Sequence, residues 1–349
     1  MKNVGIGIVG IGFMGMIHYL AAQRATRGRV VALCSRDQKK LDGDWTSIQG
    51  NFGPRGTHMD LSGVARYRDF QALLDDPNVQ LVDLCVPNDE HAPLAIRALE
   101  AGKHVLVEKP IALRVEDADA MVAAAIAHGK LLMVAHVLPF FPEFRYAAEV
   151  LRSGTLGALR AAHLTRVIAR PDWSTGIADD RSGGPAIDLH IHDTHFIGLT
   201  CGVPRSVRSV GVVERGAVVH LSTQYRYDEP NRAISAVSGA LSQKGRPFTH
   251  GFEFNLERAT LSYWQANLAD GPRVSPLCVL HADGTTESPA LGSGDPLEAF
   301  AAEIAQAVES VESGQAAPEF SADLARLALK ICQAEVESVK TGQEIRVGV

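Results

Sequence analysis

Short apolar runs alternate with amphipathic stretches over residues 3–136, and this alternation predicts strands and helices in turn. The apolar runs are β-branched or leucine-rich and apolar on both faces, as expected of parallel strands covered by helices. The predicted strands are Val4–Val9, Arg29–Cys34, Leu81–Val86, His104–Val107 and Leu131–His136. The predicted helices are Met14–Ala25, Asp69–Asp75, His91–Ala101 and Val115–His128. Repeated strand–helix–strand order predicts an α/β domain with a doubly wound parallel sheet.

The pattern changes after residue 137, where strand-like runs follow one another without regular helices between them. These predicted strands are Arg160–Ile168, Ser206–Glu214, Val218–Tyr227, Ala233–Ala240, His250–Phe254 and Thr260–Trp264. Two helices follow, at Pro296–Ser313 and Ser321–Thr341. We therefore expect a first domain over 1–137 and an α+β domain with a mostly antiparallel sheet over 138–349. The C-terminal helices are expected to pack back on the first domain.

The segment Lys40–Gly63 interrupts the first domain, because it is long and carries five glycines together with Trp45 and Phe52. Connections of this length inside a compact domain usually have a function or move. It is interpreted either as an insertion near a bound ligand or a subunit contact, or as a surface loop without a role.

Composition narrows the class of protein. The chain has 349 residues, enough for two domains, and a formal net charge of −6, which argues against nucleic-acid or anionic-membrane partners. Its five cysteines are scattered without a CxxC pair, as expected of reduced thiols in a cytoplasmic protein. The apolar stretch Val4–Ile17 is interrupted by five glycines and is interpreted as a strand and turn, not a signal peptide.

Two overlapping GxGxxG patterns begin at Gly5 and at Gly10. Only the second follows a predicted strand and opens a predicted helix, which is the context that a dinucleotide-binding turn requires. Its backbone and the helix N-terminus favour a pyrophosphate. The predicted phosphate-binding residues are Gly10, Gly12, Phe13, Met14 and Gly15.

The end of the second strand bears on the choice of dinucleotide. An acidic residue about 20 residues past the fingerprint normally binds the ribose of NAD. Ser35 occupies this position and Arg36 follows, a pair that suits the 2′-phosphate of NADP, although Asp37 could still bind a ribose. NADP is favoured and NAD remains open.

Three further motifs follow in order along the chain: Pro87-Asn88-Asp89-Glu90-His91, Gly102 to Pro110 ending in Glu-Lys-Pro, and Gly183 to His192 with the pattern GG-x3-D-x3-H. With the fingerprint in front of them, the chain resembles the glucose–fructose oxidoreductase/inositol dehydrogenase (Gfo/Idh/MocA) family over nearly its whole length.

The resemblance implies a Rossmann domain and a C-terminal domain with an open sheet that often makes oligomer contacts, here expected as a homodimer or homotetramer. It implies NAD(P)-dependent oxidation or reduction of a sugar, inositol or related polyol. Carried over to this sequence, Lys109, Asp188 and His192 are the catalytic residues. The residues implied to shape the nicotinamide pocket or line the cofactor cleft are Pro87, Asn88, His91, Glu108, Lys109 and Pro110, with a cis Lys-Pro bond possible.

The sequence departs from the family pattern at three positions. Pro185 replaces the third glycine of a common GGG, His195 stands where an aspartate is frequent, and Pro139 stands where relatives often carry arginine. These changes concern the substrate pocket and leave the fold unaffected.

The three catalytic candidates suit removal of a hydroxyl proton during hydride transfer. A histidine such as His192 has an ordinary pKa near neutrality, and a carboxylate such as Asp188 would orient it. The two are four positions apart, so on one helix they would share a face. The ammonium of Lys109 would stabilise negative charge that develops on the oxygen.

Other polar residues are candidate substrate contacts, namely His136, Arg170, Trp173 and His195. The cluster His190, His192, Asp193 and His195 also resembles a set of metal ligands, but a hydrogen-bonding substrate pocket explains it equally well, and no metal is assigned.

Two other functions remain open from the sequence. The same scaffold could carry a glycosidase or epimerase type of reaction in which tightly held NAD(P) undergoes no net redox change, or a cofactor-binding sensor without catalysis. Lys109, Asp188 and His192 together argue against the sensor, because a binding module needs no proton relay.

Overall fold

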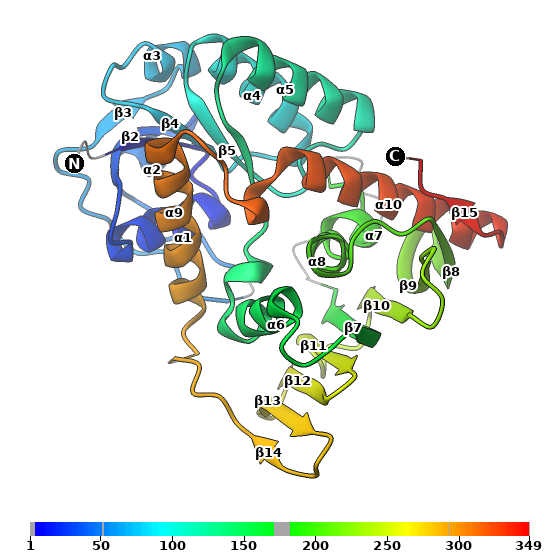
Figure 1. Ribbon diagram of the computed structural model, residues 1–349. Helices are drawn as coiled ribbons and strands as arrows, with labels where there is room; N and C mark the ends of the chain where they lie inside the picture. The colour runs from blue at the N-terminus through cyan, green and yellow to red at the C-terminus, as the bar shows by residue number, and fades with distance from the viewer. Residues whose placement is uncertain (1–3, 51, 171–181, 293, 349) are drawn as a thin grey trace. The chain divides into compact units, whose positions relative to one another are not determined.

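The computed structural model describes residues 4–50, 52–170, 182–292 and 294–348 (Figure 1). The chain divides into two compact units, each discontinuous in sequence. Unit 1 comprises Met1–Phe141 and Ser293–Arg326, and unit 2 comprises Pro142–Gly292 and Leu327–Val349. Among the described residues, no helix has the length and apolar character needed to cross a membrane.

Unit 1 is built on a six-stranded parallel sheet in the order β3-β2-β1-β4-β5-β6, which confirms the predicted doubly wound sheet. The strands are β1 (Gly5–Val9), β2 (Arg29–Cys34), β3 (Ala65–Tyr67), β4 (Leu81–Leu84), β5 (His104–Glu108) and β6 (Leu132–Ala135). β1 and β4 are buried along their whole length, as a strand with helices on both faces must be. The sequence did not predict β3, whose three residues are too few and too polar to form an apolar run.

Helices connect these strands and begin where the sequence supplies caps. Asp69 caps one of them by accepting the Ala72 N–H, so the helix begins at Phe70. The helices of this part are α1 (Phe13–Arg24), α2 (Gln38–Leu41), α3 (Phe70–Leu74), α4 (His91–Glu100) and α5 (Val115–His128), with short 3-10 turns at Asn88–Glu90 and Leu138–Phe140.

Helix α9 (Pro296–Ser313) completes unit 1, although it follows β1 by almost three hundred residues. Its Phe300, Ile304 and Val308 lie in the same apolar core as Ile17 and Ala21 of α1. A 3-10 turn at Pro318–Phe320 and the start of α10 (Ala322–Thr341) also belong to unit 1.

The segment Lys40–Gly63 packs into this core. The Trp45 side chain is fully buried, donates to the Lys40 carbonyl, and contacts Tyr19 edge-on with ring centroids 5.0 Å apart. The Phe52 ring stacks on Phe300 at 5.5 Å and meets Phe13, the first residue of α1, at 4.9 Å. The described residues of the segment are therefore a packed part of unit 1, in contact with the first residue of α1.

Unit 2 is built on a nine-stranded sheet in the order β14-β13-β12-β11-β7-β10-β9-β8-β15. All neighbours are antiparallel except β7 and β10, which confirms the predicted mostly antiparallel sheet. The strands are β7 (Leu159–Ala169), β8 (Ser206–Glu214), β9 (Ala217–Arg226), β10 (Ala233–Leu241), β11 (Phe248–Leu256), β12 (Ala259–Leu268), β13 (Gly271–His281), β14 (Thr286–Glu287) and β15 (Ile345–Arg346).

Helices of unit 2 pack on this sheet; the sequence pattern predicted the last of them, at Ser321–Thr341, and missed the other three. They are α6 (Pro142–Ser153), α7 (Pro185–Asp188), α8 (Ile191–Cys201) and most of α10. The Phe144 ring of α6 contacts Phe196 of α8 at 5.2 Å and Phe252 of β11 at 5.0 Å. The outer face of α6 is strongly polar, and its apolar residues form a narrow stripe. The sequence analysis looked for runs of apolar residues and therefore did not predict this helix.

Candidate active site

The cofactor-binding candidates of unit 1 lie at the carboxyl end of the parallel sheet. Gly10 follows β1, Ser35 follows β2, Pro87 lies beyond β4, and Lys109 follows β5. β1 lies between β2 and β4, so the order of the sheet reverses beside it. Open α/β sheets bind their ligands at this point, because the loops on either side diverge and leave a crevice.

The three glycines of the fingerprint have different physical roles. A Cβ added to Gly10 would lie 2.4 Å from the Cys85 carbonyl oxygen, and Gly10 also has φ +93°. A Cβ on Gly15 would lie 2.0 Å from the Gly10 carbonyl oxygen. A Cβ on Gly12 would meet no described atom within 4 Å. The fold therefore requires Gly10 and Gly15, whereas Gly12 leaves open space in front of the backbone.

The N-terminus of α1 has the features of an anion site. Gly12 is the N-cap and supplies no side-chain acceptor, and the first turn, which contains Phe13 and Met14, carries no acidic residue. The first N–H groups of a helix lack partners within the helix, and its dipole favours negative charge there. The space at Gly12 together with this helix end fits the pyrophosphate of a dinucleotide.

The loop after β2 holds the residues expected to choose between NAD and NADP. The Arg36 side chain is 82% exposed and pairs with Glu90, with Nη2 3.0 Å from Oε1. The Ser35 hydroxyl accepts the Asp37 N–H, while Asp37 accepts the Lys39 N–H and caps α2. One carboxylate oxygen of Asp37 thus caps α2, and the exposed guanidinium of Arg36 is held beside the start of α4 by Glu90.

The Glu108-Lys109-Pro110 segment is held by backbone hydrogen bonds. The Lys109–Pro110 peptide is cis, as the resemblance allowed. Oε2 of Glu108 accepts the Lys109 N–H at 3.0 Å, and Nδ1 of His91 lies 2.8 Å from the Pro110 carbonyl. Because His91 is fully buried, which lowers its pKa, its neutral ring ties this loop to α4 and makes a positional contribution to the site.

Unit 2 holds Asp188 and His192, but on two helices. Gly183 and Gly184 both have positive φ, and Pro185 takes the first position of α7, where its fixed φ suits a helix start. α7 ends at Asp188 and α8 begins at Ile191. The two residues therefore do not lie on one continuous helix, the condition under which they would share a face, since Leu189 and His190 form the turn between them.

Two neighbours of His192 anchor α8 to the sheet. Asp193 makes a two-pronged pair with Arg166 of β7, at 2.9 and 3.0 Å, and both side chains are buried. The His190 ring lies 2.8 Å from Ser238 Oγ and 3.1 Å from both Tyr225 and Glu335. Burial alone would lower the pKa of His190, but the Glu335 carboxylate raises it.

His192 itself is half-buried, and so is Asp188. A helix turns about 100° per residue, so His192 points roughly 200° away from His190. The two residues assigned to proton handling thus keep some solvent access while their neighbours are engaged in the fold.

The other candidate substrate contacts differ in burial and in their hydrogen-bond partners. His136, after β6, and His195, in α8, are completely buried, and burial lowers the pKa of His195 to about 3. Arg170 pairs with Glu214 at 3.0 Å. Trp173 lies outside the described residues. Among the described residues, His190, His192 and His195 do not form a group with ligand atoms close enough for one metal ion.

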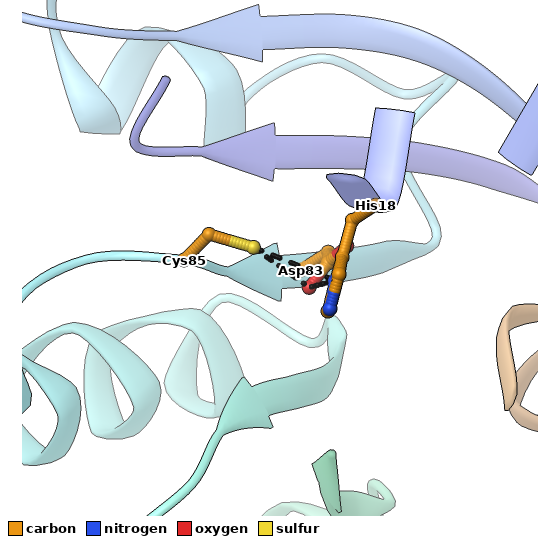
Figure 2. Close-up of side chains that lie close together, drawn as sticks. All are labelled: His18, Asp83 and Cys85. Carbon is orange, nitrogen blue, oxygen red and sulfur yellow. Dashed lines mark hydrogen bonds and ion pairs between the residues drawn. The ribbon is translucent and has the colours of Figure 1, made fainter. Parts of the chain in front are cut away.

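The sequence analysis missed a buried polar cluster beside β4 in unit 1. Figure 2 shows His18 of α1 beside Asp83 of β4 and Cys85, with their side chains converging. The available signal was Asp83, a carboxylate in the middle of an otherwise apolar, fully buried strand. Such a residue requires a buried partner.

The chain was compared with known proteins. The family described as "Oxidoreductase family, NAD-binding Rossmann fold" (GFO_IDH_MocA) matches residues 4–136. The uncharacterized oxidoreductase YdgJ of Escherichia coli (strain K12) is 31% identical over 283 residues, which cover 78% of this chain and 76% of that protein. The 1,5-anhydro-D-fructose reductase of Ensifer adhaerens is 25% identical over 98% of this chain and 99% of its own length.

Several other curated relatives match over between 46% and 59% of their own length, so this chain spans about half of each. Among solved structures, levoglucosan dehydrogenase in complex with NADH and levoglucosan has a TM-score of 0.80 at 20% identity and covers 100% of both chains. At this identity the likeness establishes the fold.

The space at Gly12 gives a first prediction. Gly12→Ala should melt like the unchanged protein, because its Cβ meets nothing, but should bind reduced nicotinamide cofactor at least about tenfold more weakly by blocking the backbone approach. Gly15→Ala is the control for a structural glycine and should cost about 1–3 kcal/mol of unfolding free energy. Unchanged cofactor titration in Gly12→Ala would remove the fingerprint from the binding site.

The buried ring of His195 gives a second prediction. Its folded pKa of about 3 lies below the ordinary 6.5, so the unfolded chain binds the proton first and stability falls as pH drops below 6.5. Between about pH 6.5 and pH 5, this group should cost the fold about 2 kcal/mol. His195→Leu should lose that much less stability on acidification in urea unfolding. Identical pH dependence in both proteins would show that burial does not lower the pKa of this ring.

Proposed function

Because this chain belongs to the Gfo/Idh/MocA family of NAD-binding oxidoreductases, we propose that it is an NAD(P)-dependent dehydrogenase or reductase acting on a CH–OH group of a sugar, inositol or related polyol. The observation that carries the proposal is the arrangement of residues at the carboxyl end of the parallel sheet. There, the open space at Gly12 and the uncapped helix α1 follow β1, and the Glu-Lys-Pro segment follows β5, with only β4 between these two strands.

The names of similar proteins support this class of substrate. One full-length relative is named a reductase of 1,5-anhydro-D-fructose, and one structure of the same fold was solved with NADH and levoglucosan. Both names refer to sugar-derived molecules with several hydroxyl groups. Histidine, carboxylate and lysine side chains suit hydroxyl recognition, because each group exchanges hydrogen bonds with an alcohol.

Three residues of this chain would handle the proton. A bound nicotinamide accepts or supplies the hydride. His192 would take the hydroxyl proton, a role that suits the imidazole of histidine, and Asp188 would orient the ring. Lys109 would donate a hydrogen bond to the substrate oxygen and stabilise its negative charge.

NADP is the proposed cofactor, with NAD as the alternative. Arg36 is highly exposed at the end of β2, and a guanidinium forms strong paired hydrogen bonds with phosphate. Asp37, the residue that could bind a ribose, already caps α2.

Self-association through the sheet of unit 2 belongs to the proposal. The strand register places one row of residues across one face: Val210, Ser222, Val237, Thr165, Gly251 and Trp264. Val210 is 68% exposed, and Val212 and Trp264 are exposed as well. Large apolar side chains exposed on one sheet face are typical of a homo-oligomer contact.

The activity can be tested by mixing the purified protein with sugars, inositols and their keto forms, using NAD(H) and NADP(H) separately, and following reduced-cofactor absorbance. Turnover with one polyol class is expected. Lys109→Ala should lose at least about a hundredfold in kcat with little change in cofactor affinity. Lys130→Ala is the control, because Lys130 precedes β6 at the opposite end of the sheet.

Full activity of Lys109→Ala would remove the lysine from the mechanism. Tight cofactor binding without turnover across the panel would contradict the net redox reaction. Exchange of a carbon-bound substrate hydrogen in that protein would then indicate a redox-neutral reaction, and its absence would indicate a sensor.

The cofactor preference gives a separate prediction. Arg36→Ala should weaken NADPH binding at least about tenfold and leave NADH binding nearly unchanged, because only the 2′-phosphate contacts the guanidinium. Glu90→Gln is the control, since it frees Arg36 from its ion pair and should not weaken NADPH binding. Equal weakening of both cofactors by Arg36→Ala would show that the 2′-phosphate assignment is wrong.

A further inference from the structure

Four elements of unit 1 each bring a titratable side chain to one fully buried place. His18 comes from α1, Asp83 and Cys85 from β4 and the residue after it, Glu108 from β5, and Glu303 from α9. Charged groups are rarely buried unless they are paired, so a cluster of this kind inside a core has a specific arrangement.

Both nitrogens of the His18 ring face carboxylate oxygens. Nδ1 lies 2.9 Å from Oδ2 and 3.1 Å from Oδ1 of Asp83, and 3.5 Å from the Cys85 sulfur (Figure 2). Nε2 lies 3.0 Å from Oε1 of Glu108, which is an ion-pair contact without hydrogen-bond geometry. A neutral imidazole has one N–H, whereas a ring between two carboxylates is best satisfied with two.

Charge supports a protonated ring. Burial alone would lower the pKa of His18, but the Asp83 carboxylate beside it raises that pKa well above the usual range. Glu303 is buried with no hydrogen-bond partner among the described residues, and burial raises its pKa well above the usual range, which favours a neutral acid. The positive ring thus faces Asp83 and Glu108 as its two anionic partners.

Three of these groups also have ligand atoms within 4.8 Å of one another, which is compatible with a metal ion. The distances favour a proton instead. Ligand atoms of a tetrahedral zinc site are about 3.3 Å apart or more, whereas Nδ1 and Oδ2 are at hydrogen-bond distance. Burial also raises the pKa of the Cys85 thiol, which opposes the thiolate that a metal needs.

We propose that His18 is a positioning residue for Lys109. Asp83 fixes the ring, the ring holds Oε1 of Glu108, and Oε2 of Glu108 accepts the Lys109 N–H. The carboxylate of Glu108 is thereby anchored on one side by the core and directs the backbone of the lysine on the other. The inference rests on the proposed function only where Lys109 acts on substrate, since the contacts themselves can be measured without turnover.

Two substitutions at His18 separate the two sides of the ring. His18→Gln places an amide N–H near the position of Nε2 and keeps a donor to Glu108, whereas His18→Asn places it near Nδ1 and keeps a donor to Asp83. The proposal predicts that His18→Asn loses at least about tenfold in kcat with unchanged cofactor affinity, and that His18→Gln retains more activity. Glu303→Gln is the matched control, buried near the same ring without a bond to the Lys109 segment, and should keep its kcat.

A second readout needs no substrate. At about pH 8, selectively labelled protein should show two ring N–H signals for His18, and the Lys109 amide should exchange slowly with solvent. That amide should exchange faster in His18→Asn and remain protected in His18→Gln and Glu303→Gln.

These results also distinguish the possible failures. Absence of turnover with both NMR signatures intact would defeat the proposed function and leave the positioning contacts established. Equal losses of kcat in His18→Asn and His18→Gln that follow their melting temperatures would reduce His18 to a structural role and overturn the proposal. Stoichiometric metal that co-purifies with the protein and is lost in both variants would overturn it too, because the ring would then be a ligand.

Discussion

Unit 1 depends on the close approach of two backbone segments, the turn after β1 and the end of β4. Gly10 packs against the Cys85 carbonyl, and Gly15 packs against Gly10, at distances where any side chain would collide. This contact brings α1 down onto the sheet. It places the N-terminus of α1 at the carboxyl end of the parallel strands. It also brings His18, which lies about one turn after Gly15, into the core beside Asp83. The proposed phosphate site and the buried cluster therefore follow from one packing constraint.

Much of the fold could be predicted from the sequence because its signals are local. Fully apolar runs such as Leu132–Ala135 identify buried parallel strands, and the fingerprint identifies the turn between the first strand and the first helix. What was missed lacks such a signal. β3 is three residues long, and α6 buries Phe144 on a narrow stripe between polar residues. Its apolar partners, Phe196 and Phe252, are more than fifty residues away along the chain.

The candidate site was predictable to a similar extent. Motifs locate Lys109, Asp188 and His192 because they are short and ordered along the chain. The sequence could not separate His190, which is bonded to Ser238 and Glu335, from His192, because helix phase and register decide which of two neighbouring histidines is buried. Nor could it join His18 to Glu108 and Glu303, since these residues meet only when four distant elements pack together. Asp83, alone in an apolar strand, was the one visible sign of that cluster.

The return of α9 to unit 1 has a consequence for how the chain is made. Phe300, Ile304 and Val308 complete the core around α1, yet they follow the entire nine-stranded sheet except its last strand in sequence. During synthesis from the N-terminus, the parallel sheet emerges first but lacks one wall of its core until residue 313 has been translated. The unit that begins the chain is thus among the last to be completed, and the nascent protein must carry an exposed apolar face on α1 while its second half is being made.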